Sequence, residues 1–245
     1  MRAAAKKRQG RQAGMSLVEI LVGVLIGMIG IVVIFQVLQL SEQRKRTTGA
    51  GSDAQISGSV GMYNLSRDLM LAGYGFGVAL NPQMGCTISA YDGSRPTNNF
   101  SFLLTPIIIT DGAGGAPDTI TVLYGNSSMF AMSQTFDTAT ATSNHTQGRG
   151  GFQKGDVVLV ATQNVPVVCA LAQITDNTNA DGVTIDHVNG TYTNYYTNAS
   201  AAARYNPAAS PVASGAGFLF NLGPTPRRNI WSISGNKLVY TDDLH

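Results

Sequence analysis

The longest apolar run of the chain lies near its beginning. Residues 20–40 contain no charged side chain, and one carboxylate, Glu19, stands directly before them. As an α-helix that rises ~1.5 Å per residue, this run spans roughly the ~30 Å hydrocarbon core of a bilayer. The pattern therefore predicts one transmembrane helix over about residues 20–40.

A cleaved secretory signal peptide is the alternative interpretation of this segment, because it also combines a basic stretch with an apolar one. The apolar run is longer than the roughly 7–15 residues of such a signal, and it ends in the charged stretch 41–46 instead of a small-x-small cleavage site. Five basic residues precede the run and three follow it. This distribution favours a cytoplasmic N-terminus.

Glycine recurs inside the apolar run. Gly23 and Gly27 form a G-x-x-x-G spacing, which allows helices to approach closely in lipid. The alternative is that glycine is simply common in membrane helices.

Helical spacing continues beyond the apolar run. Ile56, Val60, Tyr63 and Met70 lie on one helical face, and we expect this stripe to pack on the rest of the protein. Two glycines in 49–52 each weaken a helix by roughly 1 kcal/mol relative to alanine, which predicts a bend or a frayed turn there.

From about residue 100 the hydrophobic period becomes strand-like. Strands are predicted at 102–109, 119–124, 156–161, 165–174, 183–187, 217–222, 230–233 and 237–240. A hairpin turn is predicted at 234–236, and long loops at 125–150 and 189–216. The order of one long helix followed by strands predicts an α+β fold, in which a helix over 15–73, membrane-spanning in its first half, packs on an antiparallel β-rich domain over 74–245.

Charge excludes one class of function. The basic residues concentrate in the first 14 positions, and acids outnumber bases in the rest of the chain. A nucleic-acid-binding protein would need a basic stripe on its folded part, so we expect no nucleic-acid partner. Only 12% of the residues are charged, which is more typical of an exported β-rich protein or of part of an assembly than of a cytosolic enzyme.

Candidate chemistry is sparse. Cys86 and Cys169 lie in the part expected outside the cytoplasm, where a disulfide would form and stabilise the fold by roughly 4 kcal/mol; two separate thiols are the alternative. The segment 177–182 matches the first half of an EF-hand loop but lacks the closing glutamate, so a hairpin turn is the better interpretation. The three histidines are scattered. We therefore expect no catalytic site, no cofactor and no metal site.

The stretch "GMSLVE", residues 14–19, resembles the processing site of type IV prepilins. The resemblance implies that a prepilin peptidase removes the basic leader 1–14 by cutting between Gly14 and Met15, and that the new N-terminus is methylated. It also implies that Glu19 is an assembly contact, paired in the filament with the α-amino group of Met15 on a neighbouring subunit. The alternative is an ordinary single-pass anchor with a stray glutamate, whose burial in lipid would cost a few kcal/mol.

Two further segments, "LSRDLMLAGYGFG" at 65–77 and "FQKGDVVLV" at 152–160, resemble the PilW family of minor pilins. Independently of family, Arg67 and Asp68 are expected to form a solvated helix end that Gly73 caps. The resemblance implies a minor pilin that initiates and assembles a type IV pilus near its tip, with other minor pilins, the major pilin and a tip adhesin as partners. It would reside in the bacterial inner membrane before assembly and in the filament afterwards. The alternatives are a J-type pseudopilin of a type II secretion system and a membrane-anchored periplasmic enzyme or binding protein.

Overall fold

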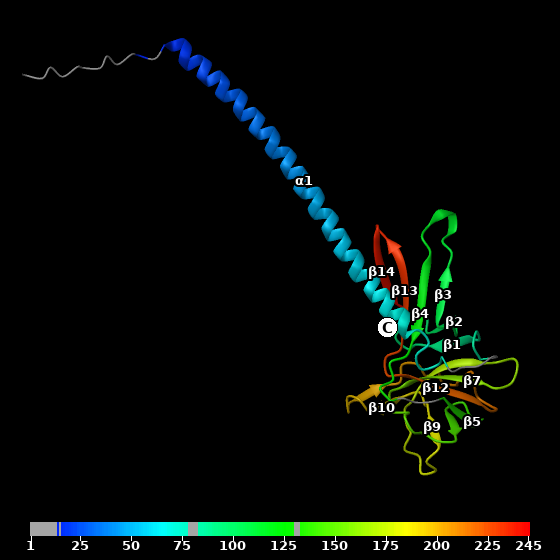
Figure 1. Ribbon diagram of the computed structural model, residues 1–245. Helices are drawn as coiled ribbons and strands as arrows, with labels where there is room; N and C mark the ends of the chain where they lie inside the picture. Colours follow the sequence, from blue (N-terminus) through cyan, green and yellow to red (C-terminus); the bar gives the residue numbers. More distant parts are fainter. Residues whose placement is uncertain (1–13, 15, 78–82, 130–132) are drawn as a thin grey trace, which may run out of the picture. The chain divides into compact units, whose positions relative to one another are not determined.

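The computed structural model describes residues 14, 16–77, 83–129 and 133–245. Met15 and nearly all of the expected leader therefore lie outside the described residues. The chain divides into two compact units, Met1–Ser59 and Val60–His245, and each is considered by itself below (Figure 1).

The long helix α1 (Leu17–Leu71) contains 55 residues, and a short 3₁₀ helix, η1 (Ala113–Gly115), lies between the strands at 107–110 and 119–124. Helix α1 begins directly after Ser16, whose carbonyl oxygen accepts the first helical hydrogen bonds, from the amides of Glu19 and Ile20. The frayed turn predicted as one possibility at 49–52 is wrong, because all four residues are helical. A propensity deficit of about 1 kcal/mol per glycine is small compared with the sum over a long helix.

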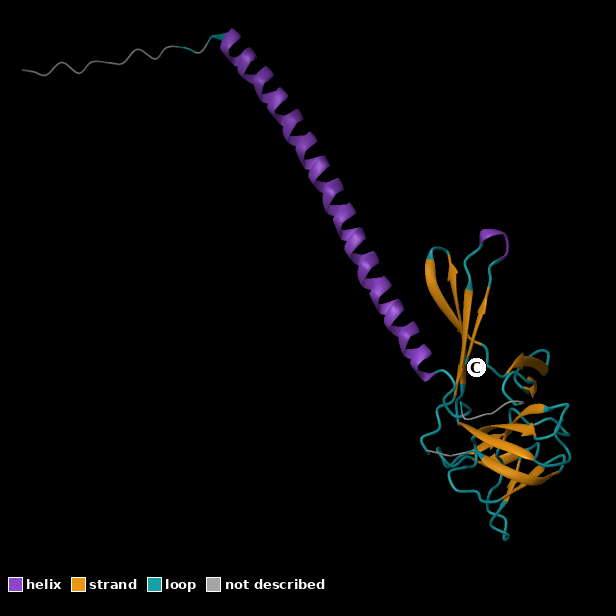
Figure 2. Ribbon diagram, turned by 45° about the vertical axis from the view of Figure 1, so that its right-hand side comes forward, coloured by secondary structure: helices purple, strands orange, loops and turns teal. Residues whose placement is uncertain are grey.

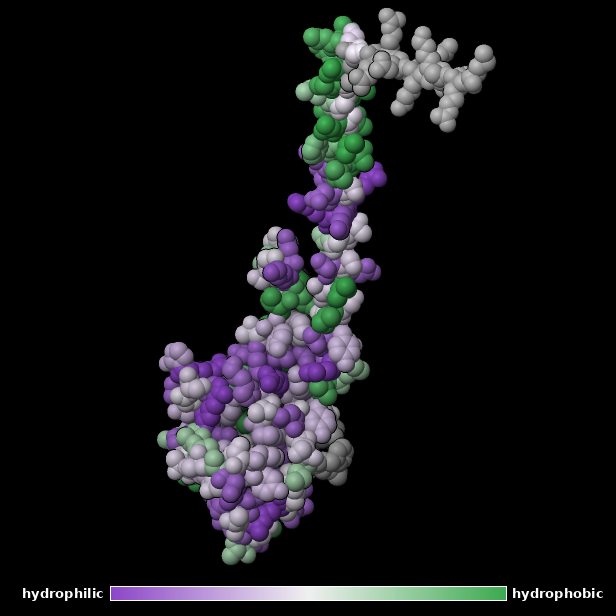
Figure 3. Space-filling view, turned by 90° about the vertical axis from the view of Figure 1, so that its left-hand side faces the viewer, coloured by the Kyte–Doolittle hydropathy of each residue, from purple (hydrophilic) through white to green (hydrophobic). Residues whose placement is uncertain are grey.

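The first unit consists of the greater part of α1. Its N-terminal half contains one segment long and apolar enough to cross a membrane, with a mean hydropathy of 2.9 over 18 residues and none of that window buried. Figure 3 shows this hydrophobic surface and the hydrophilic band that follows it along the helix. The helix is thus long and apolar enough to span a membrane, which is consistent with the predicted membrane anchor.

The second unit is rich in strands, which form three sheets (Figure 2). In spatial order, the eight-stranded sheet contains β2 (Asn99–Leu103), β1 (Thr87–Tyr91), β8 (Cys169–Gln173), β7 (Val157–Thr162), β12 (Gly217–Gly223), β5 (Gln134–Ala139), β6 (Ser143–Thr146) and β9 (Thr184–Asp186). The four-stranded sheet contains β14 (Lys237–Asp242), β13 (Arg227–Ser234), β4 (Thr119–Tyr124) and β3 (Ile107–Thr110), and a third pair joins β10 (Thr191–Thr193) to β11 (Ser200–Ala202). All strand pairs are antiparallel except β1 with β8. This layout confirms the predicted α+β class.

The core lies on both faces of the eight-stranded sheet. Every residue of β8 is buried, and β7 is buried except for its last residue. Alternate residues of β7 join two different clusters: Val157, Leu159 and Ala161 lie in one, and Val158 and Val160 in the other. A strand covered on both faces has a continuous apolar sequence, which is why this run was predictable.

Several strand predictions need correction. The run 102–109 is two strands, because β2 ends at Leu103 and β3 starts only after Pro106, which cannot donate to a ladder. The expected loop 125–150 contains β5 and β6, and the expected loop 189–216 contains β10 and β11. The hairpin turn at 234–236 is confirmed: Ser234 pairs with Lys237 across Gly235 and Asn236, both with positive φ.

The end of α1 packs on the four-stranded sheet through a face that the sequence did not indicate. Leu65 forms a buried cluster with Val122, Tyr124 and Trp231, and Leu69, Ala72, Ile120 and Leu238 pack against it. At 100° per residue this face lies opposite the stripe expected to be buried, and that expectation is wrong. The stripe is open instead, with exposed fractions of 61% for Ile56, 55% for Val60, 67% for Tyr63 and 75% for Met70.

Candidate functional site

Glu19 lies in the first turn of α1, where the exposed helical amides carry partial positive charge that favours a carboxylate. Apolar side chains that are themselves exposed surround it along the helix, including Val18 at 67% and Val22 at 49%. None of the ion pairs found among the described residues includes Glu19. The carboxylate therefore has no charge partner within the part of the chain that is described.

Glycine continues the helical face that carries Glu19. At 100° per residue, Gly23 and Gly30 lie within about 40° of Glu19, and Gly27 lies at the edge of the same face. A Cβ atom placed at any of these glycines would meet nothing within 4 Å. Packing within the chain thus does not require glycine there, and the face is smooth enough for a second helix to approach.

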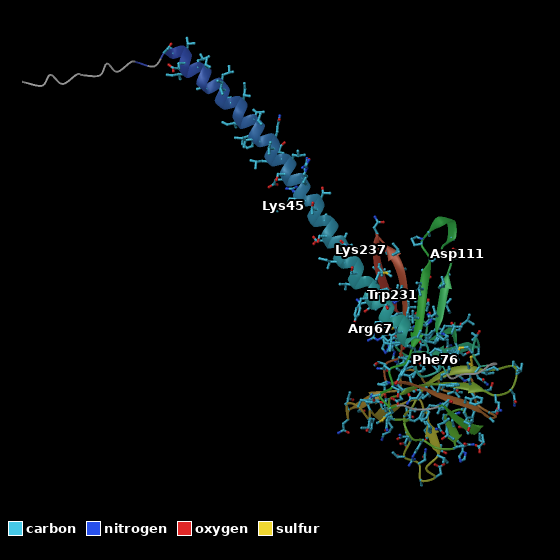
Figure 4. All side chains as sticks on the ribbon, in the orientation of Figure 1. Lys45, Arg67, Phe76, Asp111, Trp231 and Lys237 are labelled. Atoms are coloured by element: carbon cyan, nitrogen blue, oxygen red, sulfur yellow. A yellow bond between two sulfur atoms is a disulfide. The ribbon has the colours of Figure 1, made fainter. Side chains whose placement is uncertain are left out.

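A buried polar cluster joins the last turns of α1 to the four-stranded sheet. The carboxylate of Asp68 accepts hydrogen bonds from the Tyr124 hydroxyl at 2.9 Å, the Asn229 amide at 2.7 Å and the Trp231 indole N–H at 3.0 Å. Only 3% of the surface of Asp68 is exposed, so the prediction of a solvated helix end is wrong for this residue. Arg67 is exposed, so the same prediction is correct for Arg67. Figure 4 labels Arg67 and Trp231 beside this junction. We call Asp68, Tyr124, Asn229 and Trp231 the Asp68 cluster.

The donors of the Asp68 cluster are all neutral. Burial, and secondarily the hydrogen bond to Asp68, raises the pKa of Tyr124 to about 12, so its hydroxyl remains a donor at every physiological pH. A hollow of about 220 Å³ beside the cluster is lined by Asn64, Arg67, Arg227 and Tyr240 as well. No local sequence pattern indicates this cluster, because its other members lie 56 to 163 residues from Asp68 in the chain.

Directly after α1 in sequence, residues 73–75 are held between the two larger sheets. Gly73 adopts φ +80 and donates its amide to the Leu123 carbonyl at 2.9 Å, which confirms the expected glycine cap. The Tyr74 carbonyl accepts a hydrogen bond from the amide of Gly125 at 2.7 Å. A Cβ atom at Gly75 would lie 2.6 Å from the Asn221 carbonyl oxygen, so only glycine fits there.

A second charged cluster joins the β1–β2 connection to the segments that follow β11 and β14. The fully buried side chain of Asp92 receives two 2.8 Å hydrogen bonds from the Arg204 guanidinium and one from Arg95 at 3.3 Å. Burial alone would raise the pKa of Asp92, but the hydrogen bonds from Arg204 and Ser94 hold it well below its usual value. Arg95 and Arg228 both pair with Asp243. The carboxylates and guanidinium groups of this cluster pair with one another, which indicates a structural role.

Asp156 is the other fully buried carboxylate, directly before β7. Burial raises the pKa of Asp156. The hydrogen bonds that its carboxylate accepts from the Tyr196 hydroxyl at 2.6 Å and the Asn221 amide at 2.8 Å oppose this rise but do not cancel it. Asp156 follows Gly155, whose φ of +106 forms the turn into the strand.

A hollow of about 570 Å³ beside β1 and β2 has no acidic or basic side chain in its lining.

The sulfur atoms of Cys86 and Cys169 form the predicted disulfide. Both lie in the buried cluster under β1, β7 and β8. The histidines stay apart: His145 pairs with Asp137 at the surface, His187 is buried at 3% exposure, and His245 lies beside Asp242. Across residues 16–77, 83–129 and 133–245, no group of three or more His, Cys, Asp or Glu side chains is arranged to hold a metal ion.

The segment 177–182 forms a turn before β9. The Asp181 carboxylate accepts hydrogen bonds from the amides of Val183 and Thr184, at 3.0 and 3.1 Å, and Gly182 has φ +75. The hairpin-turn interpretation of this segment is therefore correct.

Comparison with known proteins identifies no relative: no family model, no curated protein and no solved structure matches the chain.

Proposed function

We propose that the protein is a PilW-type minor pilin that takes part in initiating and assembling a type IV pilus. The observation that carries this proposal is the lone carboxylate in the first turn of a 55-residue helix with an exposed apolar surface. In lipid an ionised side chain costs at least a few kcal/mol unless it finds a partner. The amine of Met15 on an adjacent subunit would provide that partner once cleavage after Gly14 has freed it.

Two features of the helix support assembly through helix packing. The face with Glu19 carries glycines that no intramolecular contact explains. The stripe of Ile56, Val60, Tyr63 and Met70 is exposed on the side of α1 opposite the sheet contact. Both surfaces remain available to helices of neighbouring subunits.

The strand-rich unit supports an extracellular role for the same chain. It combines a buried disulfide with long Thr- and Asn-rich connections and few charges, which suits an oxidising compartment. In this proposal the chain is held in the inner membrane until a prepilin peptidase processes it. Afterwards it joins the other minor pilins and the major pilin near the filament tip, where a tip adhesin would also bind.

The test is substitution of Glu19 in a strain that lacks the wild-type copy. Glu19→Ala and Glu19→Gln should insert into the membrane as well as the wild type, because removal of a charge favours the lipid phase. Incorporation into sheared filaments should fall at least tenfold for both, since loss of one partner of a desolvated ion pair costs about 3–5 kcal/mol.

Glu42→Gln is the matched control, because Glu42 is the only other glutamate and its pair with Arg46 is exposed at the surface. A surface pair of this kind contributes at most about 1 kcal/mol. Normal incorporation of both Glu19 variants would contradict the proposal. Loss of protein secretion with intact pili would indicate a pseudopilin of a type II secretion system.

A further inference from the structure

The connection between β9 and β10 contains the single Asn-Gly dipeptide of the chain, Asn189-Gly190. Figure 1 shows β10 at the periphery of the strand-rich unit. Both residues of the dipeptide are exposed, and the Asn189 side chain makes no hydrogen bond with another described residue. Because glycine has no Cβ atom, its main-chain nitrogen can approach the preceding side chain without hindrance. An attack by the Gly190 nitrogen on Cγ of Asn189 would close a five-membered ring.

The amide of Gly190 differs from those of the other glycines that follow an acidic residue or its amide. Three aspartates also precede glycine, in Asp92-Gly93, Asp111-Gly112 and Asp181-Gly182. Each of these glycine N–H groups donates a hydrogen bond: to the Arg204 carbonyl at 2.9 Å, the Asp118 carboxylate at 3.1 Å and the Asn179 carbonyl at 3.1 Å, respectively. The Gly190 N–H has no acceptor among the residues that the structure describes, and the space beside this glycine is open. Of the four pairs, only this one combines a carboxamide with an unbound main-chain nitrogen.

We propose that Asn189 is a site of spontaneous covalent modification, at which deamidation through a cyclic succinimide gives aspartate and isoaspartate. The Gly190 nitrogen loses its proton to solvent and attacks Cγ of Asn189. The new C–N bond replaces the bond to the side-chain NH₂ group, which takes up a proton and leaves as ammonia. Water then opens the ring at Cγ to give aspartate, or at the main-chain carbonyl carbon to give isoaspartate. The net reaction converts an amide and water into a carboxylic acid and ammonia, without oxidation or a cofactor.

The isoaspartyl product would alter the main chain beside a hydrogen bond that closes the β10–β11 pair. The Gly190 carbonyl accepts the Ala203 amide at 2.7 Å, directly beyond the last residue pair of that ladder. In isoaspartate the main chain passes through Cβ, which inserts a methylene group before Gly190. Strands β10 and β11 pair only with each other, so we expect this hydrogen bond to weaken while the eight-stranded sheet is unchanged. This inference does not depend on the proposed role in a pilus.

The experiment is incubation of the full-length protein in detergent at mildly alkaline pH, in water enriched in heavy oxygen, followed by peptide mapping. Hydrolysis of the ring introduces heavy oxygen at position 189, and a protein isoaspartyl methyltransferase labels the isoaspartyl form. We expect both signals to accumulate at Asn189 with time. Asn189→Gln should remain unlabelled over the same period, because its longer side chain would have to close a larger ring. In the isoaspartyl form the Ala203 amide should exchange its hydrogen faster than in the unmodified chain.

Asp181→Asn provides a matched site in the same molecule, since it creates a second Asn-Gly pair at an exposed position in a turn. There the Gly182 N–H is held by the Asn179 carbonyl. In the folded protein, position 181 of this variant should deamidate roughly fivefold or more slowly than Asn189, because a hydrogen bond must break first. In urea, where the hydrogen bond is absent, the two positions should react at similar rates.

Two results would overturn the proposed site. One is a wild-type chain that gains no heavy oxygen at position 189 after prolonged incubation. The other is a ratio of the rates at positions 181 and 189 that stays the same when the protein unfolds, since local sequence and not the hydrogen bond would then determine the rates. An Ala203 amide that is equally protected in the isoaspartyl and unmodified chains would contradict the predicted effect on β10 and β11.

Discussion

Removal of the Asp68 carboxylate should separate α1 from the four-stranded sheet more effectively than loss of any other single side chain of the helix. Asp68→Ala takes away the acceptor of three buried donors: Tyr124 and Trp231 lose their partner, and the Asn229 amide keeps only its 3.2 Å hydrogen bond to the Tyr124 hydroxyl. Asp68→Asn keeps the shape and one acceptor oxygen. Its new amide group can donate to the Tyr124 hydroxyl, which can both donate and accept.

The size of the effect follows from the three hydrogen bonds. Each bond to a charged acceptor contributes about 1.5–3 kcal/mol, and the cost of burying an unpaired carboxylate offsets part of the sum. We therefore expect Asp68→Ala to lower the free energy of unfolding by about 3–5 kcal/mol. For Asp68→Asn we expect about 1 kcal/mol, because neutral hydrogen bonds replace charge-assisted ones.

The assay uses the single tryptophan of the chain, which is itself a member of the cluster. Urea unfolding of the full chain in detergent, followed by Trp231 fluorescence, should show a midpoint lower by roughly 1.5–2 M for Asp68→Ala. Asp53→Ala, at an exposed aspartate of the same helix, is the control and should leave the midpoint unchanged. A midpoint for Asp68→Ala equal to that of the control would refute the reasoning.

Three further predictions concern processing, the disulfide and acid stability. The intact mass of the membrane-extracted protein should correspond to a chain that starts at Met15 with one added methyl group; a chain that starts beyond residue 40 would instead indicate an ordinary signal peptide. Replacement of both Cys86 and Cys169 by serine should lower the free energy of unfolding by roughly 4 kcal/mol in urea unfolding, since the bridge closes a loop of 83 residues in sequence separation; an unchanged stability would show that the bridge does not constrain the unfolded chain. The hydrogen bonds from Arg204 lower the pKa of Asp92 in the folded state, so its contribution to stability should be complete above the unfolded value of 3.8 and should be lost as the pH falls below it. Asp92→Asn should therefore flatten the acid limb of a stability-pH curve, and an unchanged limb would assign acid sensitivity to other carboxylates.

The parts of the fold that depend on local pattern were predictable from the sequence. The membrane-spanning run, the apolar strands β7 and β12 and the Gly235–Asn236 hairpin all have a signal within a few residues. Strand β5 was missed because Thr and Asp alternate with only one large apolar residue, Phe136. It lies between β6, which is next to it in sequence, and β12, which is distant in sequence.

The face of α1 that contacts the sheet could not be chosen from hydrophobicity. Large apolar residues at Ile56, Val60, Tyr63 and Met70 formed the stronger stripe, whereas the buried face contains Gly61, Leu65 and Asp68. A Cβ atom at Gly61 would lie 3.3 Å from Leu238, so a small residue permits close approach there. The carboxylate of Asp68 belongs to this face only because its donors come from β4 and β13, which a local pattern does not contain.

The crossing at Gly73–Gly77 has a mechanical consequence. Any tension applied along α1 reaches the strand-rich unit through the Asp68 cluster and then through this short segment, whose backbone is bonded to β4 at Leu123 and to Gly125 just beyond it. At Gly75 the segment lies against the Asn221 carbonyl of β12, so the load divides between the two larger sheets instead of peeling one strand. Unfolding that starts at the last turns of α1 must therefore break contacts with both of these sheets.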